Sequence, residues 1–423
     1  MRVLMVSTEY PPMRGGVGRY TANLTKALTN VDVNNAQEKH SRANNDKVEV
    51  QVVCDDKGGG QFSGIHPRNS QNSQVLLKLV EREKPDIVHI QFEPGLYGLE
   101  LASIGSRVGI TNLDTFYFEC SIPIVTTFHS VYNLRQWMDQ TSIVKKSGKT
   151  GAFGVPARAL VRLWKHFINY RAFVNLNKHK LQQSKAAIAF SHNMFTLLGA
   201  GKRNETIYHG AEPSSRISLS REENKAYFSL HAPSGYNMNN CPRIALAVGF
   251  ETLLKGWDII QKMSIPDRWA VVVNSSRGSY SCENLDPKFN NESQIPKKKG
   301  IIDLKKGFLS DDELSRLFYA SDAVLLPYKI TSGSGVMFDA LAHGLPFVAS
   351  DLEFFKEFSN QGLGITVKRK PSEFARGLKL LDDNYNFYKT TVEKFKVKLK
   401  WSQIAAEHIR VYNRVIKETK MIE

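Results

Sequence analysis

The chain alternates short runs of apolar residues with longer segments in which apolar positions recur every three or four residues. The short runs predict strands buried on both faces of a sheet, and the longer periodicity predicts amphipathic helices. The strands are expected at Val3–Val6, Val48–Cys54, Ile87–Gln91, Ile122–Thr127, Ala186–Ser191, Glu205–Tyr208, Ile244–Val248, Trp269–Asn274, Ile301–Leu304, Ala323–Pro327, Pro346–Ala349 and Ile365–Val367. The clearest helices are expected at Val17–Leu28, Gln74–Glu83, Arg158–Gln183 and Trp401–Lys417. Such alternation is typical of α/β domains with parallel sheets.

The pattern also divides the chain. Ser229–Pro242, rich in Asn, Pro and Gly, separates the two strand series and is expected to be a linker. A chain of 423 residues is long enough for two domains with separate cores. We therefore expect an N-terminal domain over residues 1–235, a C-terminal domain over residues 236–400 and a final helix over residues 401–423. The polar segment Asn34–Asp46 is expected to be an exposed loop.

The stretch Ser321–Asp351 carries the clearest candidate chemistry. It reads as a buried strand, a glycine-rich loop, a helix, a tight turn and a second strand. Ser334 and Gly335 open the helix, where backbone N–H groups and the positive end of the helix dipole attract phosphate. Asp339 lies about one turn further along, where a carboxylate can reach a ribose. The stretch therefore predicts a cradle for a nucleoside diphosphate.

The same stretch resembles the donor-site segment of the retaining family 4 glycosyltransferases, which have the GT-B fold. In that family two Glu residues, with seven residues between them, precede the run A-x-A-x-G-x-P-V-V-A-S. Asp339 stands in place of the second Glu, and the residues from Ala340 to Ser350 fit the run that follows. The first Glu falls at Thr331, so the carboxylate that lies near the transferred sugar in the family is missing. Backbone contacts from Gly333 and Ser334 are the alternative near the sugar.

The resemblance implies an α/β chain with the GT-B fold, in which two Rossmann-like domains have parallel sheets that face an interdomain cleft. It also implies that the last helix crosses back to the first domain. The acceptor would be bound mainly by the N-terminal domain, and the nucleotide-sugar donor by the C-terminal domain.

Three loops that follow strands match further patterns of this family. Gly15 and Gly16 let backbone approach a ligand, and the resemblance implies contact with the donor diphosphate; a plain tight turn is the alternative. His129 follows a strand at its carboxyl end, where the resemblance implies contact with the transferred sugar; a structural histidine is the alternative. Lys255 would neutralise the diphosphate as it leaves, although Phe250 replaces the family's Arg; a surface lysine is the alternative.

Acidic residues are few at the expected site. Glu93 follows the strand Ile87–Gln91 and is a further candidate near the sugar. Asp311–Glu313 follows Ser310 and is expected to cap a helix rather than to bind a metal. The sequence shows neither a convincing D-x-D metal pattern nor paired carboxylates of the glycosidase type. We therefore expect metal-independent chemistry with no cofactor other than the nucleotide-sugar substrate.

The charge of the chain adds a second expectation. Lys and Arg number 57 against 41 Asp and Glu, a formal net charge of +16 that favours anionic partners. The basic residues are dispersed and no nucleic-acid-binding module is recognisable, so no nucleic-acid partner is expected. Residues 145–180 combine the basic loop Lys145–Lys149 with a helix that mixes cations and large apolar groups. That segment is expected either to contact an anionic membrane or to cover a sheet as an ordinary amphipathic helix.

The apolar runs and the cysteines of the sequence indicate where the protein is expected to be located. No apolar run reaches the length of a membrane span, and the N-terminal apolar run is expected to be a strand rather than a signal peptide. The cysteines Cys54, Cys120, Cys241 and Cys282 are widely spaced, as is typical of free thiols in a reducing compartment. We expect a cytoplasmic protein, either free or peripheral on the cytoplasmic membrane face.

Two functions are consistent with these patterns. The first is a retaining glycosyltransferase that moves a sugar from a nucleotide-diphosphate sugar to a glycan, lipid or small-molecule acceptor. The alternative is a catalytically inactive GT-B-like protein that binds nucleotide or glycan. Thr331 and Phe250, which replace the family's Glu and Arg, favour the alternative.

Overall fold

The structure, a computed structural model, describes residues 1–30, 48–101, 109–139, 156–199, 204–217, 220–229, 243–280 and 300–421. The expected loop Asn34–Asp46 and the basic loop Lys145–Lys149 lie outside the described residues. The expected linker, apart from Ser229, lies outside them as well, and so do Cys241 and Cys282. Cys54 and Cys120 are free thiols.

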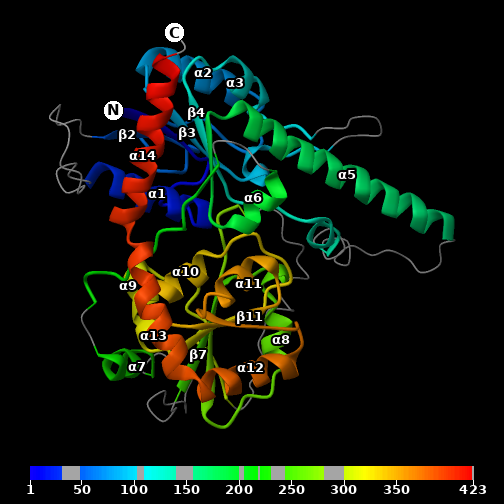
Figure 1. The fold of residues 1–423 in the computed structure, drawn as a ribbon, viewed down its shortest axis with the longest axis vertical. Coiled ribbons are helices and arrows are strands. Elements are labelled where there is room, and N and C mark those ends of the chain that lie inside the picture. Colours follow the sequence, from blue (N-terminus) through cyan, green and yellow to red (C-terminus); the bar gives the residue numbers. More distant parts are fainter. Residues whose placement is uncertain are drawn as a thin grey trace. The chain divides into compact units, whose positions relative to one another are not determined.

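The chain divides into two compact units (Figure 1). The first comprises Met1–Thr141, Lys149–Gly210 and Trp401–Glu423, so the final helix belongs to the first unit by its contacts. The second begins at Ala211, earlier than the expected boundary between residues 235 and 236. The segment after Gly210 joins the second unit because it bonds to one of that unit's helices: the Ser214 N–H donates to Ser315 Oγ at 2.9 Å.

The first unit is built on six parallel strands in the order β2-β1-β3-β4-β5-β6. These strands are β1 (Arg2–Val6), β2 (Glu49–Val53), β3 (Ile87–Phe92), β4 (Ile124–Phe128), β5 (Ala186–Ala189) and β6 (Asn204–Thr206). The first five coincide with the expected apolar runs, whereas β6 is polar and half-buried and shares only Glu205 and Thr206 with the expected strand Glu205–Tyr208. Every residue of β3 and β4 is buried, as is usual for central strands of a parallel sheet, and this includes polar residues of both strands, among them His89 and Gln91. The strand order reverses between β1 and β3, and open parallel sheets bind ligands beside such a reversal.

Helices cover both faces of this sheet. They are α1 (Gly16–Asn30), α2 (Asn72–Glu83), the 3-10 helix η2 (Pro94–Tyr97), α3 (Asp114–Glu119), α5 (Pro156–Gln183), α6 (His192–Leu198) and α14 (Trp401–Lys420). Helix α14 packs along α1, although the two are separated by almost the whole chain (Figure 1). Helix α5 extends well beyond the strands of its unit (Figure 1). None of the helices that the structure describes is long and apolar enough to cross a membrane.

The second unit is also built on six parallel strands, in the order β12-β11-β10-β7-β8-β9. The strands are β7 (Arg243–Phe250), β8 (Trp269–Ser276), β9 (Ile301–Asp303), β10 (Ala323–Leu326), β11 (Phe347–Ser350) and β12 (Gly364–Val367), again as predicted. The order reverses between β7 and β10, the pattern of dinucleotide-binding Rossmann folds. The loops after β7 and β10 therefore form the expected ligand position of this unit.

The helical elements of the second unit are α7 (Arg221–Ser229), η4 (Leu253–Lys255), α8 (Trp257–Lys262), α9 (Asp311–Tyr319), α10 (Gly335–Ala342), α11 (Glu353–Ser359), α12 (Pro371–Asp383), α13 (Tyr385–Phe395) and η7 (Lys396–Leu399). Apolar side chains of α8 and α12 join those of the strands in one core. Phenylalanines of α10, α11 and α13 form a second cluster of packed rings. Ser310 caps α9 in a capping box with Glu313, which confirms the role predicted for that acidic run.

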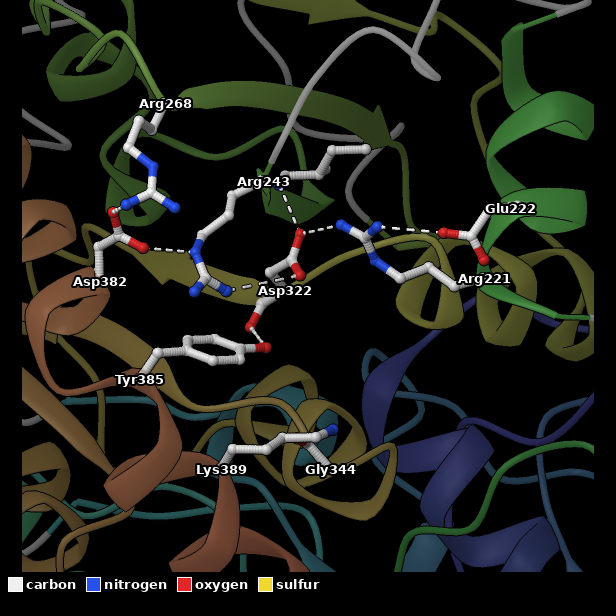
Figure 2. Close-up of polar contacts among 10 residues, drawn as sticks. Arg221, Glu222, Arg243, Arg268, Asp322, Gly344, Asp382, Tyr385 and Lys389 are labelled. Carbon is white, nitrogen blue, oxygen red and sulfur yellow. Dashed lines mark hydrogen bonds and ion pairs between the residues drawn. The ribbon is translucent and has the colours of Figure 1, made fainter.

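An ion-pair cluster ties the amino ends of β7 and β10 to the surrounding helices (Figure 2). Asp322, just before β10, accepts hydrogen bonds from the Ile244 N–H at 2.8 Å and from the Arg221 guanidinium at 2.5 Å. Arg243 Nη1 lies 3.9 Å from the same carboxylate, and its guanidinium carbon lies 3.8 Å from the centre of the Tyr385 ring. The cluster therefore fastens α7 and α13 to the amino ends of the two central strands of the sheet.

Asp322→Asn is expected to destabilise the second unit by about 2–3 kcal/mol, because two guanidinium groups lose their buried anion. Glu373→Gln is the matched control, since the Glu373 pair with Arg376 Nη2 at 2.7 Å lies at the surface, where solvent screens it, and its loss is expected to change stability much less. Chemical denaturation followed by circular dichroism measures both. Equal shifts for the two variants would show that the cluster adds no more than a surface pair.

Candidate functional site

The loop after β10 begins the candidate site of the second unit. Ser334 is the N-cap of α10, and its hydroxyl accepts a hydrogen bond from the Met337 N–H at 3.2 Å. Because that hydroxyl caps the helix, the groups available to an anion are the backbone N–H groups of the first turn, including Gly335. The structure thus places the predicted phosphate-binding residues at a helix start.

Thr331, which replaces the family's first Glu, shapes this loop. Its Oγ1 accepts a hydrogen bond from the Gly333 N–H at 3.2 Å and donates one to the Gly333 carbonyl. The side chain is 8% exposed. The threonine side chain therefore closes a local turn with the Gly333 backbone. The longer side chain of a glutamate at this position would extend its carboxylate away from the backbone.

Lys255 lies at the reversal of strand order, beside the same loop. Its loop packs on the loop after β10, because the Lys329 N–H donates to the Leu254 carbonyl at 2.7 Å. The Lys255 Nζ lies 3.8 Å from the centre of the Tyr328 ring, a cation–π contact. The Ser334 hydroxyl lies 3.5 Å from the Tyr328 hydroxyl. The structure thus brings together Lys255 and the start of α10, which are far apart in the sequence.

Asp339 and Phe250 complete the candidate residues of this unit. Asp339 lies on α10, one turn after Gly335, and is 4% exposed. Its backbone carbonyl accepts a hydrogen bond from His343 Nδ1 at 2.7 Å. Phe250 ends β7, and its carbonyl accepts a hydrogen bond from Trp257 Nε1 at 3.3 Å. The apolar side chain at Phe250 supplies no cation where the family has an arginine.

The glycine-rich loop of the first unit surrounds Glu9, a residue that the sequence patterns did not single out. The Gly18 N–H, in the first turn of α1, donates to Glu9 Oε2 at 3.4 Å. A Cβ at Gly15 would lie 2.0 Å from Glu9 Oε2, whereas a Cβ at Gly16 would meet nothing within 4 Å. Burial raises the pKa of Glu9 to about 7, although the backbone N–H groups lower it and nearby Glu93 raises it further.

Gly15 and Gly16 therefore differ. Gly15 is a glycine because a buried carboxyl occupies the space beside it, which accounts for Gly15 without a ligand. Gly16 opens α1 beside free space and keeps its candidacy for contact with an anion. The signal that sequence reasoning missed is an acidic residue two positions before the P-P-x-x-G-G pattern, although its burial does not follow from that spacing.

Gly15→Ala is expected to lower the thermal unfolding midpoint of the first unit, because its Cβ displaces the Glu9 carboxyl from the start of α1. Gly16→Ala is the matched control and is expected to change stability by less than about 0.5 kcal/mol, as is usual for a surface substitution. Differential scanning calorimetry of the two variants measures the contrast. An equal loss of stability at the two positions would contradict the assignment of Gly15 to Glu9.

His129 lies just after β4 and is partly exposed. Its Nε2 lies 2.9 Å from Gln91 Oε1, and its ring packs edge-on against Tyr20 and Phe190. Burial, with a smaller effect of nearby His209, lowers the pKa of His129 to about 3. The imidazole is therefore neutral at physiological pH and suited to hydrogen bonding rather than to carrying charge.

Glu93 follows β3 at the reversal of strand order in the first sheet. Burial raises its pKa, while hydrogen bonds to Ser130 and to the Gly95 backbone lower it. Glu93, Glu9 and His129 thus follow β3, β1 and β4, all at the carboxyl edge of one sheet. Among the described residues, no group of three or more His, Cys, Asp or Glu side chains is arranged to hold a metal ion.

Solved structures share this architecture over the full length of the chain. Sucrose-phosphate synthase from Thermosynechococcus elongatus is 14% identical with a TM-score of 0.60, covering 99% of this chain and 100% of that one. The chain has the GT-B fold. Alr3699/HepE of Anabaena in complex with UDP-glucose is 12% identical with a TM-score of 0.60, and both chains are covered completely. The catalytic domain of starch synthase IV from Arabidopsis thaliana, bound to ADP and acarbose, is 14% identical with a TM-score of 0.56 and 99% coverage of each chain.

No family model matches the sequence, and no curated protein matches it. Identities of 12–14% establish the GT-B fold of the chain and leave its activity to be argued from its own residues.

Proposed function

We propose that this GT-B protein is a glycosyltransferase that moves a sugar from a nucleoside-diphosphate sugar to an acceptor, with retention of the anomeric configuration. The observation that carries the proposal is the meeting of Lys255 with the start of α10 at the strand-order reversal of the second sheet. A cation beside a helix start is suited to a diphosphate. Structures that share the fold hold UDP-glucose or ADP, which supports the same ligand class.

The second unit supplies the groups for the donor. As the bond to the sugar breaks, the departing diphosphate gains negative charge, which the Lys255 ammonium and the N–H groups of Ser334 and Gly335 stabilise. Asp339 binds the ribose, and Gly333 and Thr331 lie near the sugar. The protein's own charges do this work, so we propose metal-independent transfer with no cofactor.

The first unit supplies the groups for the acceptor and the transferred sugar. The neutral His129 imidazole hydrogen-bonds a sugar hydroxyl, with Glu93 nearby, and Gly16 approaches the diphosphate. These roles require both units to act on one substrate, and they stay predictions. The acceptor is a glycan, a lipid or a small molecule.

The proposal is tested by incubating the purified chain with UDP-, GDP- and ADP-sugars without acceptor and measuring nucleotide release. Release from one donor, lost in Lys255→Ala, supports a transferase and identifies the donor. The second candidate, an inactive GT-B protein that binds nucleotide or glycan, is favoured by Thr331, which closes a local turn where a carboxylate is expected. Calorimetric binding of a donor without any release would favour that candidate.

We also propose that the segment 145–180, most of which belongs to α5, contacts an anionic membrane surface. Trp164 and Phe167 are 65% and 40% exposed, and Arg171 is exposed on the same helical face. Apolar rings beside cations are typical of helices that lie at a lipid interface. Co-sedimentation with phosphatidylglycerol vesicles, and loss of it in Trp164→Ala/Phe167→Ala, tests the proposal. Equal binding to neutral phosphatidylcholine vesicles would contradict a role for charge.

A further inference from the structure

Helix α14 carries two buried polar residues on one face, His408 and Tyr412. They lie one helical turn apart, and both are 0% exposed. Each makes a hydrogen bond with a residue from the N-terminal part of the chain: His408 Nε2 lies 3.4 Å from the Tyr20 hydroxyl, and the Tyr412 hydroxyl lies 2.6 Å from His89 Nδ1. Burying such groups is costly unless they are paired, so the contacts constrain how α14 docks.

The contact between Tyr412 and His89 leads to His129 through a chain of hydrogen bonds. Gln91 Nε2 lies 3.1 Å from Met5 Sδ, and a thioether sulfur only accepts, so this side of the amide is the nitrogen. The amide oxygen therefore faces His129 Nε2 at 2.9 Å, and that nitrogen must carry the proton. The same Gln91 Nε2 also lies 3.3 Å from His89 Nε2.

The direction of the whole chain follows from this assignment. Two groups face His89 Nε2: the Thr127 hydroxyl at 2.8 Å and the Gln91 amide nitrogen at 3.3 Å. The hydroxyl can donate or accept, but the amide nitrogen can only donate, so Nε2 accepts. The proton of the neutral His89 ring therefore sits on Nδ1 and is donated to the Tyr412 hydroxyl at 2.6 Å. Burial lowers the pKa of His89 well below its usual range, which keeps the ring neutral. Tyr412, His89, Gln91 and His129 thus form one hydrogen-bonded chain with a single polarity.

The contact between His408 and Tyr20 reaches the same His129 imidazole from another side. His408 Nδ1 lies 2.7 Å from the Ile404 carbonyl and donates to it, which leaves Nε2 to accept from Tyr20. The ring centre of Tyr20 lies 5.3 Å from that of His129, with the planes 79° apart. Two sets of contacts therefore run from α14 to His129, one to its Nε2 and one to its ring, and they touch each other where the His408 ring packs against His89.

We propose that α14 positions the His129 imidazole and fixes its tautomer through His408 and Tyr412. Gln91 is the intermediate positioning residue, and none of the three need touch a substrate. The consequence for transfer rests on the proposed function, in which His129 bonds a hydroxyl of the transferred sugar. In that function, the docking of the last helix of the chain sets the orientation of a residue at the sugar.

The experiment uses the full chain labelled with ¹⁵N-histidine, in which two-dimensional NMR at pH 7 reports which ring nitrogen of His129 is protonated. His129→Asn assigns the signal. Tyr412→Phe removes one buried hydroxyl, and Tyr117→Phe is the matched control, because its hydroxyl bonds Thr126 at 2.9 Å outside the chain of bonds. Gln91→Leu removes the direct acceptor of the His129 proton. Donor turnover is measured on the same samples.

In the parent chain, we expect the His129 proton on Nε2. In Tyr412→Phe, His89 loses the acceptor of its Nδ1 proton, so the chain of bonds can reverse and the His129 proton shifts toward Nδ1. Gln91→Leu is expected to do the same, and Tyr117→Phe to leave the signal unchanged. An unchanged His129 signal in Tyr412→Phe and Gln91→Leu overturns the inference, whatever the rates. A shifted signal with unchanged turnover supports the positioning and instead removes His129 from the proposed function.

Discussion

Replacing Lys255 with alanine is expected to lower donor turnover by about 10²- to 10³-fold, the usual cost of losing one preorganised charge at a developing anion. The charge on the diphosphate increases as the sugar leaves, so the ammonium acts more strongly on the transition state than on the bound donor. The loss should therefore appear in kcat more than in KM. Steady-state nucleotide release with the donor found in the panel measures both constants.

Two controls separate charge from damage to the loop. Lys379→Ala removes an exposed lysine of α12 and should leave the rate unchanged. Lys255→Arg keeps a cation above Tyr328 and should recover part of the rate, although a guanidinium differs in shape from an ammonium. A Lys255→Ala rate equal to that of Lys379→Ala would remove Lys255 from the mechanism and leave the start of α10 and Gly16 to bind the diphosphate.

Most of the fold was predictable because most strands are encoded locally as apolar runs. Even the short strand β9 falls within the expected run Ile301–Leu304, whereas β6 is polar and half-buried and only overlaps the expected strand Glu205–Tyr208. The domain boundary was less predictable for the opposite reason. Residues after Gly210 precede the expected linker, and their partners in the second unit lie about a hundred positions further on: Ser214 bonds Ser315, and Arg221 pairs with Asp322.

The candidate site shows the same division between local and distant information. The glycine-rich loop and helix start around Ser334 are contiguous, so the pattern predicted their geometry. Glu9 was missed because its burial depends on how α1 returns to the end of β1, which spacing alone does not reveal. His89 and Gln91 read as ordinary residues of a strand, and their polar partners come from other elements: Thr127 and Tyr412 for His89, and His129 for Gln91.

Gly256→Ala is expected to be the most damaging glycine substitution in the second unit. Its φ is +72°, and a Cβ there would lie 1.8 Å from the Pro327 carbonyl oxygen. Left-handed backbone costs a residue with a side chain roughly 1–2 kcal/mol, and the overlap adds to this by separating the loops after β7 and β10. Since Lys255 is the preceding residue, we expect both a lower unfolding midpoint and a loss of donor turnover of at least about tenfold, equivalent to about 1.4 kcal/mol.

Gly307→Ala isolates the second part of that effect. Gly307 has nearly the same φ, +69°, but its Cβ would meet nothing within 4 Å. This variant is therefore destabilised only by backbone strain, by about 1–2 kcal/mol, and should keep its donor turnover because Lys255 is undisturbed. Denaturation midpoints and nucleotide release measured on both variants separate strain from overlap. Similar turnover in the two variants would mean that the contact between Gly256 and Pro327 does not hold Lys255 in its place.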